Sequence, residues 1–355
     1  MLLTRAALAG DPDAAASAAS LRHATDHQPG LRRVRHGRGF AYLSARGVRV
    51  RDRATLSRIR ALAIPPAWTA VWIAADPHAH VQATGRDARG RKQYRYHARW
   101  RAVRDEVKYH RFTAFCHALP ALRRRVAADL ARPELCKRKV VATVVSLMEA
   151  AQLRVGNEEY ARANGSYGAT TLRDRHVHVH GHTLELAYRA KSGVARRVRV
   201  TDRRLARIVA RCRDLPGQHL FQYVDGGRVH PVTSSDVNAY LHDAAGDSFT
   251  AKDFRTWAAT IGAALLLATR ESPASTRACK RCVREVVASL AEQLGHTPAV
   301  CRASYIHPRV LDDFARGRLA RIAPRVQRIP TRASLDVRAL RAAEPIVAGY
   351  LRQRP

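Results

Sequence analysis

The chain contains few cysteines for its length. Six cysteines among 355 residues are too sparse and too irregularly spaced for a disulfide framework, which indicates a reducing compartment. The only close pair, Cys279 and Cys282, has no second Cys or His pair at a zinc-site spacing. We therefore interpret this pair as two thiols on a helix and predict no metal there.

Acidic residues are also scarce, numbering 29 against 63 lysines and arginines, which gives a formal net charge of +34. A protein this basic usually meets phosphate, so the charge predicts a nucleic-acid partner. The basic residues run from Arg5 to Arg354 instead of forming a tail, which favours a folded surface around a polyanion. The excess of Arg over Lys, with the high Ala usage, is typical of a GC-rich bacterial genome.

A long apolar run is missing too. The uncharged apolar run Trp257–Thr269 is too short to cross a bilayer and lies between Arg255 and Arg270. The N-terminal residues are Ala-rich with acids at Asp11 and Asp13, unlike a secretion signal. We therefore predict no membrane partner and a cytoplasmic, nucleoid-associated location, with residues 1–30 as a flexible leader.

Several common catalytic motifs are absent. The KSG at Lys191–Gly193 lacks the preceding Gly-rich loop of a Walker motif, and the sequence has no HExxH, no GxSxG and no acidic cluster suited to two metals. If the protein acts on phosphodiesters, we expect it to do so without a metal and without ATP.

The sequence predicts an α+β fold. Gly and Pro divide residues 31–104 into short segments, and alternation at 70–74 and 81–84 indicates antiparallel strands, so we expect a small β-rich module there. Helical periodicity dominates residues 105–320, with a β interlude at 170–200. We assign 105–320 to a mainly helical domain with this β insertion, and 321–355 to a basic C-terminal extension.

Four histidines alternate along the β interlude, at positions 176, 178, 180 and 182. Same-face positions of a strand lie nearly 7 Å apart, so these side chains cannot all reach one ion. We interpret them as one polar face of a strand.

Transfer at a phosphodiester without a metal needs a nucleophile, cations around the non-bridging oxygens and an acid for the leaving group. Arg154 follows an apolar helical run and precedes a glycine, so a helix end can aim it. Lys191 lies between two strand-like runs, which predicts a hairpin tip. Lys252 and Arg255 are three residues apart and would share one helix face.

The stretch GHTPAVCRASYIHP contains the remaining candidates. Gly295 is a plausible helix C-cap, and Thr297-Pro298 predicts a new helix start. The restarted segment can fold back and bring His296 and Tyr305 to one phosphate.

Five sequence motifs occur in this order: RVGNEEY, AKSG, KDFRTW, GHTP and SYIHP. In this order they resemble the motifs of the type IB DNA topoisomerases, most closely those of the compact poxvirus-like form of bacteria. The resemblance covers roughly residues 31–318. The resemblance implies that Tyr305 attacks a DNA phosphodiester and forms a 3′-phosphotyrosyl link. It implies that Arg154 and Arg255 hold the scissile phosphate, with Arg154 also helping proton movement. Lys191 would protonate the leaving 5′ oxygen, and His296 would donate a hydrogen bond to a non-bridging oxygen.

The same resemblance implies DNA contacts outside this set. The segment RKQYRYH is similar to the family's major-groove segment, which assigns Gln93, Tyr94 and Tyr96 to DNA binding. Tyr160 and Lys252 are further DNA contacts. The acidic pair before Tyr160 departs from the viral pattern, which puts a viral-type target preference in doubt.

The resemblance also implies a partner and a mode of binding: a monomer that clamps double-stranded DNA, with no cofactor. A tyrosine recombinase is one alternative, although recombinases usually carry His-x-x-Arg where this chain has Lys252-Asp253-Phe254-Arg255. A non-catalytic basic DNA-binding protein, in which Tyr305 only packs, is the other.

Overall fold

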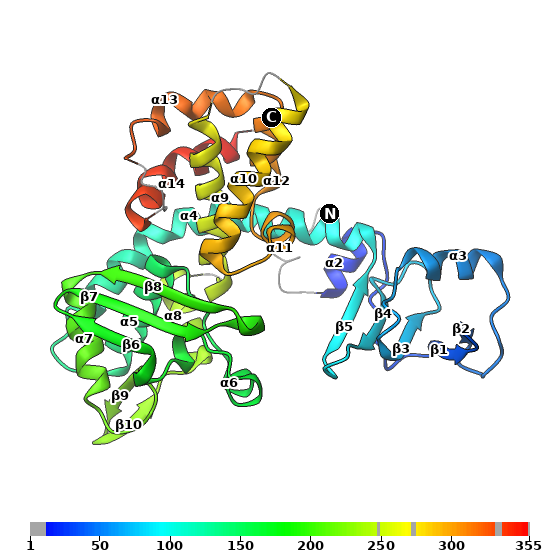
Figure 1. Cartoon of the computed structure of the whole chain (residues 1–355), viewed down its shortest axis with the longest axis horizontal. Coiled ribbons are helices and arrows are strands. Elements are labelled where there is room, and N and C mark those ends of the chain that lie inside the picture. Colours follow the sequence, from blue (N-terminus) through cyan, green and yellow to red (C-terminus); the bar gives the residue numbers. More distant parts are fainter. Residues whose placement is uncertain (1–11, 247–248, 271–274, 331–335, 354–355) are drawn as a thin grey trace. The chain divides into compact units, whose positions relative to one another are not determined.

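The computed structural model describes residues 12–246, 249–270, 275–330 and 336–353. The chain forms two compact units, with the boundary between Arg111 and Phe112 (Figure 1). This boundary lies inside helix α4 (Ala98–Leu130), which also contains the predicted boundary between residues 104 and 105. We describe each unit by itself.

The first unit contains a five-stranded antiparallel sheet in the order β2-β1-β3-β4-β5. Its strands are β1 (Gly30–His36), β2 (Gly39–Leu43), β3 (Thr69–Ala74), β4 (Val81–Arg86) and β5 (Lys92–Tyr96). Helix α3 (Arg53–Ala61), capped by the Asp52 carboxylate on the Thr55 N–H, buries Ile59 against Leu31 and Ile73 of the sheet. The strands predicted at 70–74 and 81–84 are confirmed as β3 and β4.

The segment predicted as a leader differs from that prediction where it is described. Residues 1–11 lie outside the described residues. Helix α2 (Pro12–Ala18) follows, and Ala16, Ala19 and Leu21 form a small apolar cluster with Trp100. The reason is burial: these alanines and the leucine cover an indole that would otherwise contact water.

The second unit is mainly helical, which with the first unit confirms the α+β fold. Its principal helices after α4 are α5 (Lys137–Ala151), α6 (Glu158–Asn164), α7 (Arg203–Arg213), α8 (Ser234–Ala245), α9 (Ala251–Ala268), α10 (Thr276–Leu294), α11 (Pro298–Ser304), α12 (Pro308–Ala315), α13 (Ala323–Val326) and α14 (Val337–Arg352). Short 3-10 turns lie at Ala169–Thr171, Asp174–His176, Lys191–Gly193 and Arg318–Ile322.

A three-stranded antiparallel sheet interrupts these helices, in the order β6-β7-β8. Its strands are β6 (Val177–His180), β7 (Thr183–Arg189) and β8 (Ala195–Thr201), and a separate hairpin pairs β9 (Gln222–Asp225) with β10 (Arg228–Pro231). Helix α5 packs against β8, and α7 packs against β6 and β7. The predicted polar face on the first strand holds for His178 and His180, which are exposed, whereas His176 is buried.

Helix α9 lies at the centre of the second unit and contacts α5, α8, α10, α12 and α14 (Figure 1). Fifteen of its 18 residues are buried. A helix that is apolar on nearly all sides must be surrounded by protein, and the neighbouring helices provide that cover.

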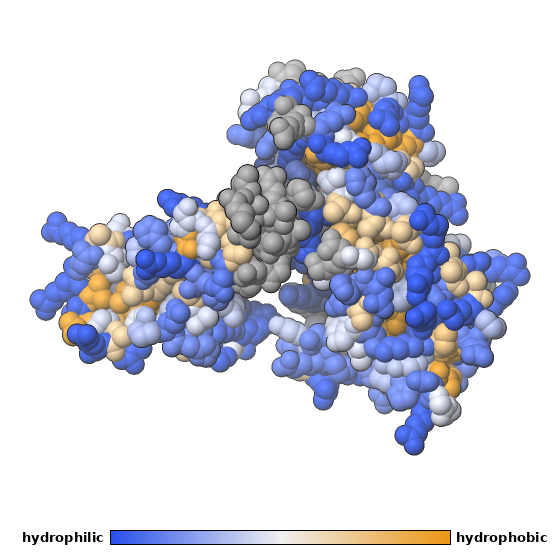
Figure 2. All heavy atoms as spheres, turned by 180° about the vertical axis from the view of Figure 1, so that it is seen from behind, coloured by the Kyte–Doolittle hydropathy of each residue, from blue (hydrophilic) through white to orange (hydrophobic). Residues whose placement is uncertain are grey.

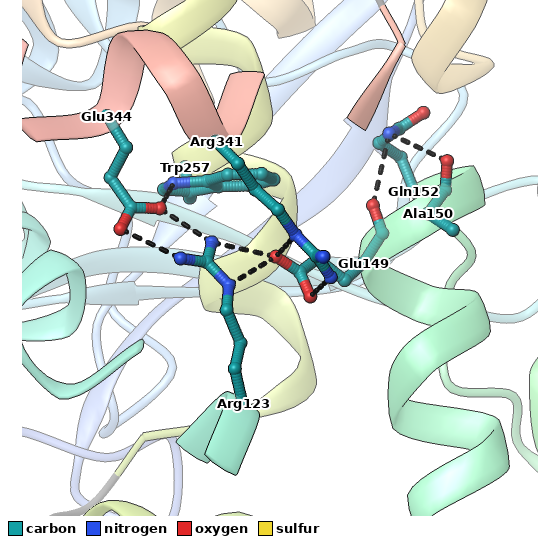
Figure 3. A network of polar contacts seen from close by, with 7 residues as sticks. All are labelled: Arg123, Glu149, Ala150, Gln152, Trp257, Arg341 and Glu344. Atoms are coloured by element: carbon teal, nitrogen blue, oxygen red, sulfur yellow. Dashed lines mark hydrogen bonds and ion pairs between the residues drawn. The ribbon is translucent and has the colours of Figure 1, made fainter. Parts of the chain in front are cut away.

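A buried polar network fastens the C-terminal helix α14 to this core (Figure 3). Arg123 of α4 lies 2.7 Å from carboxylate oxygens of both Glu149 in α5 and Glu344 in α14. Trp257 of α9 donates its indole N–H to Glu344 at 2.8 Å, and Arg341 of α14 pairs with Glu149 at 2.6 Å. The segment predicted as a basic extension therefore contributes core contacts within its described residues.

The surface is strongly polar. Figure 2 shows hydrophilic residues over most of the visible face, with apolar residues in small patches. None of the helices in the described part of the chain is long and apolar enough to cross a membrane.

Candidate active site

Arg154 is placed by the end of helix α5. The helix ends at Ala151, and the left-handed backbone of the following residue, the C-cap Gln152 (φ 48°), turns the chain away from the helix axis. Two residues later Arg154 is half-buried, and its Nη2 donates to the Gly295 carbonyl at 2.9 Å. The predicted position of Arg154 at a helix end is thus confirmed.

Arg255 lies in the first turns of α9 and is only 2% exposed. Its Nη1 donates to the Gln152 carbonyl, and its Nη2 donates to the Leu294 carbonyl at 2.5 Å. Lys252 is exposed, so the two residues do not share a surface face as their spacing suggested. The difference arises because α9 is covered by protein on almost every side.

The His296 ring lies between the two arginines. Its Nδ1 is 3.2 Å from Arg154 Nη2, and its Nε2 is 2.6 Å from Arg255 Nη2. Guanidinium groups only donate, and a neutral imidazole has a single acceptor nitrogen, so only one of these contacts is a hydrogen bond. The shorter contact assigns the acceptor to Nε2 and the ring proton to Nδ1.

Tyr305 follows α11 and faces the same group. Gly295 (φ 62°) closes α10, and Thr297 caps α11 through the Val300 N–H, which confirms both predicted helix signals. The Tyr305 ring stacks on the His296 ring with centroids 4.3 Å apart and an interplanar angle of 27°. The Arg255 guanidinium carbon lies 5.6 Å from the Tyr305 ring centroid. The fold therefore brings His296 and Tyr305 together as predicted.

A buried threonine fixes the Tyr305 backbone. The Thr260 hydroxyl, on α9, donates to the Tyr305 carbonyl at 3.1 Å and accepts from the His307 N–H at 3.1 Å. Arg255 and Thr260 are five residues apart on the same helix, so α9 positions both a cation and the tyrosine segment.

Backbone carbonyls hold these arginines. The Gln152 carbonyl lies at the C-terminal end of α5, and the Leu294 and Gly295 carbonyls lie at the C-terminal end of α10. The last carbonyls of a helix have no partner within it and carry the negative end of its dipole. In the described residues, neither arginine is recorded in contact with a carboxylate. The group therefore keeps its net positive charge, which suits an anionic ligand.

Burial and mutual repulsion shift the titration of the group. Burial first, and then the charges of Arg255 and Arg154, lower the pKa of His296 to about 3. Burial and the charge of Arg154 lower the pKa of Arg255 to about 10, and burial lowers the pKa of Arg154. At neutral pH the imidazole is neutral and both arginines are charged, so the group favours an anionic ligand.

Comparison with known proteins identifies the family of this chain. Residues 97–328 match the family model described as the catalytic core of eukaryotic DNA topoisomerase I, and residues 39–87 match the N-terminal domain of bacterial DNA topoisomerase IB. A DNA topoisomerase 1B of Acanthamoeba polyphaga mimivirus is 36% identical over 261 residues, which cover 71% of this chain and 77% of the viral protein. The chain belongs to the type IB DNA topoisomerase family. It is therefore an isomerase that acts on DNA.

Among the described residues of this topoisomerase, no hydrogen bond or ion pair joins the arginine group to the catalytic candidate Lys191 or to the DNA-contact candidate Tyr160. Lys191 is exposed at the tip of the β7–β8 hairpin, where Arg189 pairs with Ala195, which confirms the predicted hairpin. Its charge contributes to the lowered pKa of His296, but no direct contact is recorded between them. Tyr160, at the start of α6, is 45% exposed and free to contact a ligand.

The predicted DNA-binding residues of the first unit lie on β5. Tyr94 is 43% exposed, and its ring stacks on Tyr96 with centroids 5.8 Å apart. Gln93 donates to Asp87 at 3.0 Å, and the Lys92 ammonium lies 5.6 Å from the Tyr94 ring centroid. The exposed Tyr94 ring beside a lysine is suited to nucleic acid, whereas Tyr96 is half-buried against the cluster around Trp100.

Sequence reasoning missed Arg196 of β8, which is 9% exposed. Its Nη2 donates to the Ala151 carbonyl at 3.2 Å, at the same end of α5 that holds Arg255. A signal was present: Arg196 is in phase with Val198 and Val200 in the period-two pattern of the strand, so it falls on the inward face.

Proposed function

We propose that this topoisomerase relaxes supercoiled double-stranded DNA through transient single-strand cleavage at Tyr305, with strand swivelling and religation, and without ATP or a metal. The observation that supports the proposal most is the stacking of Tyr305 on His296 beside Arg255, inside a group whose positive charge has no acidic partner among the described residues. The DNA substrate of this enzyme class has a phosphodiester backbone, which is the anion that we expect this positively charged group to bind.

The proposed step is an in-line displacement at phosphorus. Tyr305 Oη forms the bond to phosphorus as the bond to the 5′ oxygen breaks, which leaves a 3′-phosphotyrosyl link. The tyrosine loses its proton in this step, with Arg154 helping that proton leave, and Lys191 gives a proton to the 5′ oxygen. Religation is the reverse. Because one phosphate ester replaces another, no ATP is needed.

Arg154 and Arg255 supply fixed donors for the non-bridging oxygens. Guanidinium groups fit phosphate through paired N–H donors and stay charged at neutral pH. Backbone carbonyls already hold both arginine side chains in the free protein. Positive charge that is fixed in place before DNA binds lowers the activation barrier for cleavage more than charge that must first be oriented. His296 can donate to the phosphate from Nε2 only when Arg255 releases that nitrogen and the ring proton moves to it.

Lys191 and the DNA-contact residues complete the proposal. The exposed hairpin tip is free to present the Lys191 ammonium to bound DNA. We propose that Gln93, Tyr94 and Tyr96 in the first unit, and Tyr160 and Lys252 in the second, contact the same duplex. A monomer would then clamp its substrate with both units.

Relaxation of supercoiled plasmid in EDTA tests the function. The wild-type protein is expected to remove positive and negative supercoils without ATP, and Tyr305→Phe is expected to bind DNA without relaxing it. Relaxation that survives Tyr305→Phe would overturn the nucleophile assignment. Products joined at one defined sequence, instead of relaxed circles, would favour a recombinase.

A further inference from the structure

We propose that Arg196 is a positioning residue of the cleavage site, which holds the two phosphate-binding arginines in place and adds a buried positive charge to the scissile phosphate. The proposal rests on the proposed function of the Tyr305 site. It assigns a role in this reaction to β8, the strand that follows the Lys191 hairpin.

Arg196 connects the two helix ends that hold the other arginines. Its Nη2 donates to the Ala151 carbonyl, and the next carbonyl along the chain, that of Gln152, accepts from Arg255. On its other side it reaches Gly295, whose carbonyl accepts from Arg154. A methyl group on the Gly295 Cα would lie 3.5 Å from Arg196 Nη1 and 3.7 Å from Arg154 Nη1. Both guanidinium groups therefore approach one point beside Gly295.

One nitrogen of Arg196 is left without a partner. Nη1 is buried and has no hydrogen-bond partner in the structure. The groups that interact electrostatically with Arg196 include Arg154, Arg255, His296 and the Tyr188 phenol, and none of these is a carboxylate. Tyr188 lies directly across the β7–β8 ladder from Arg196.

A buried charge without a counter-charge destabilises a folded protein. The free protein therefore carries an arrangement that is unfavourable until an anion arrives, as expected of a site shaped for its ligand and not for stability. Arg123, which fastens helix α14 to the core, is by contrast paired with the carboxylates of Glu149 and Glu344.

The test compares Arg196→Met, Arg196→Lys and the control Arg199→Met. Arg199 lies on the same strand with an exposed side chain, and its 3.5 Å contact with Glu185 is a surface pair. Arg196→Met and Arg199→Met each remove one positive charge, so the control separates a loss of net charge from a loss of the Arg196 contacts. Single-turnover cleavage of a nicked DNA substrate, DNA affinity and the thermal unfolding midpoint are measured for each protein.

We expect Arg196→Met to slow cleavage about ten- to a hundredfold, because a displacement of catalytic groups by about 1 Å can cost on the order of a hundredfold. Arg196→Lys should cleave faster than Arg196→Met but more slowly than the wild type, because lysine restores the positive charge but not the paired N–H donors of the guanidinium group. The unfolding midpoint of Arg196→Met should equal or exceed that of the wild type. The stabilisation of the wild type by inorganic phosphate should shrink in this variant and persist in Arg199→Met.

Two results would overturn the inference: cleavage by Arg196→Met at the Arg199→Met rate, or a lowered unfolding midpoint that accounts for slow cleavage in both Arg196 variants. Failure of the proposed function is distinguishable, because the wild type itself would then form no covalent link to DNA, whereas the phosphate measurement would still report on Arg196.

Discussion

Glu344 of helix α14 offers a direct measure of how firmly the C-terminal helix is attached to the catalytic core. Glu344→Ala removes both bonds to Arg123 and the acceptor of the Trp257 indole. Breaking a buried pair costs about 3–5 kcal/mol, and we take about 3 kcal/mol because Arg123 keeps Glu149. An unsatisfied buried N–H on Trp257 adds at least about 1 kcal/mol.

The expected loss of about 4 kcal/mol can be read from urea unfolding followed by far-UV circular dichroism. With a urea dependence of about 3 kcal/mol per molar, the midpoint should fall by about 1.3 M. Glu344→Gln keeps an acceptor for the Trp257 indole, so its urea midpoint should fall less than that of Glu344→Ala. The control is Glu285→Ala, which breaks an exposed pair with Arg270 and should leave the midpoint almost unchanged. Equal midpoints for Glu344→Ala and Glu285→Ala would refute this account of the network.

Three further predictions concern the site. The folded-state pKa of His296, about 3, lies below its ordinary value of 6.5, so only the unfolded chain takes up this proton between those values. Stability should therefore fall as the pH drops from 7 to 4, and urea midpoints should show a shallower fall for His296→Asn. Gly168→Ala would place a methyl group 2.6 Å from the Gly156 nitrogen and 2.7 Å from the Arg154 carbonyl, whereas Gly349→Ala meets nothing within 4 Å. Single-turnover cleavage should fall at least tenfold for Gly168→Ala and stay at the wild-type rate for Gly349→Ala. Thr260→Val removes the hydroxyl that holds the Tyr305 carbonyl, so cleavage should slow while DNA affinity, measured by fluorescence anisotropy, stays unchanged.

Local signals account for the parts of the structure that the sequence predicted. The Gly295 cap, the Thr297-Pro298 helix start and the Lys191 hairpin depend on residues close in the chain, and short-range preferences determine them. The burial of Arg255 depends instead on the carbonyls of Gln152 and Leu294, which lie 103 and 39 positions away in the sequence, at the ends of other helices. No pattern around Arg255 encodes those partners.

The C-terminal helix illustrates the same limit. Arg123 and Glu344 are 221 positions apart, and only the packed fold reveals that they meet. A local reading of residues 321–355 registers their basic charge and misses their apolar face, with Leu340 and Val347 buried in the core. The residues that resemble the topoisomerase motifs are a different case. Several separated motifs in a fixed order identify a family, whereas no single one of those motifs does.

The position of α14 in the chain gives this enzyme an order of events during its synthesis. Ribosomes add about 5–20 residues per second, so residues 112–352 take roughly 10 to 50 seconds to be made after the first unit is complete. Once helix α9 has been made, its Trp257 indole still lacks Glu344 until α14 follows. A nascent chain can thus fold its five-stranded sheet early, but it completes the polar network around α9 only near the end of synthesis.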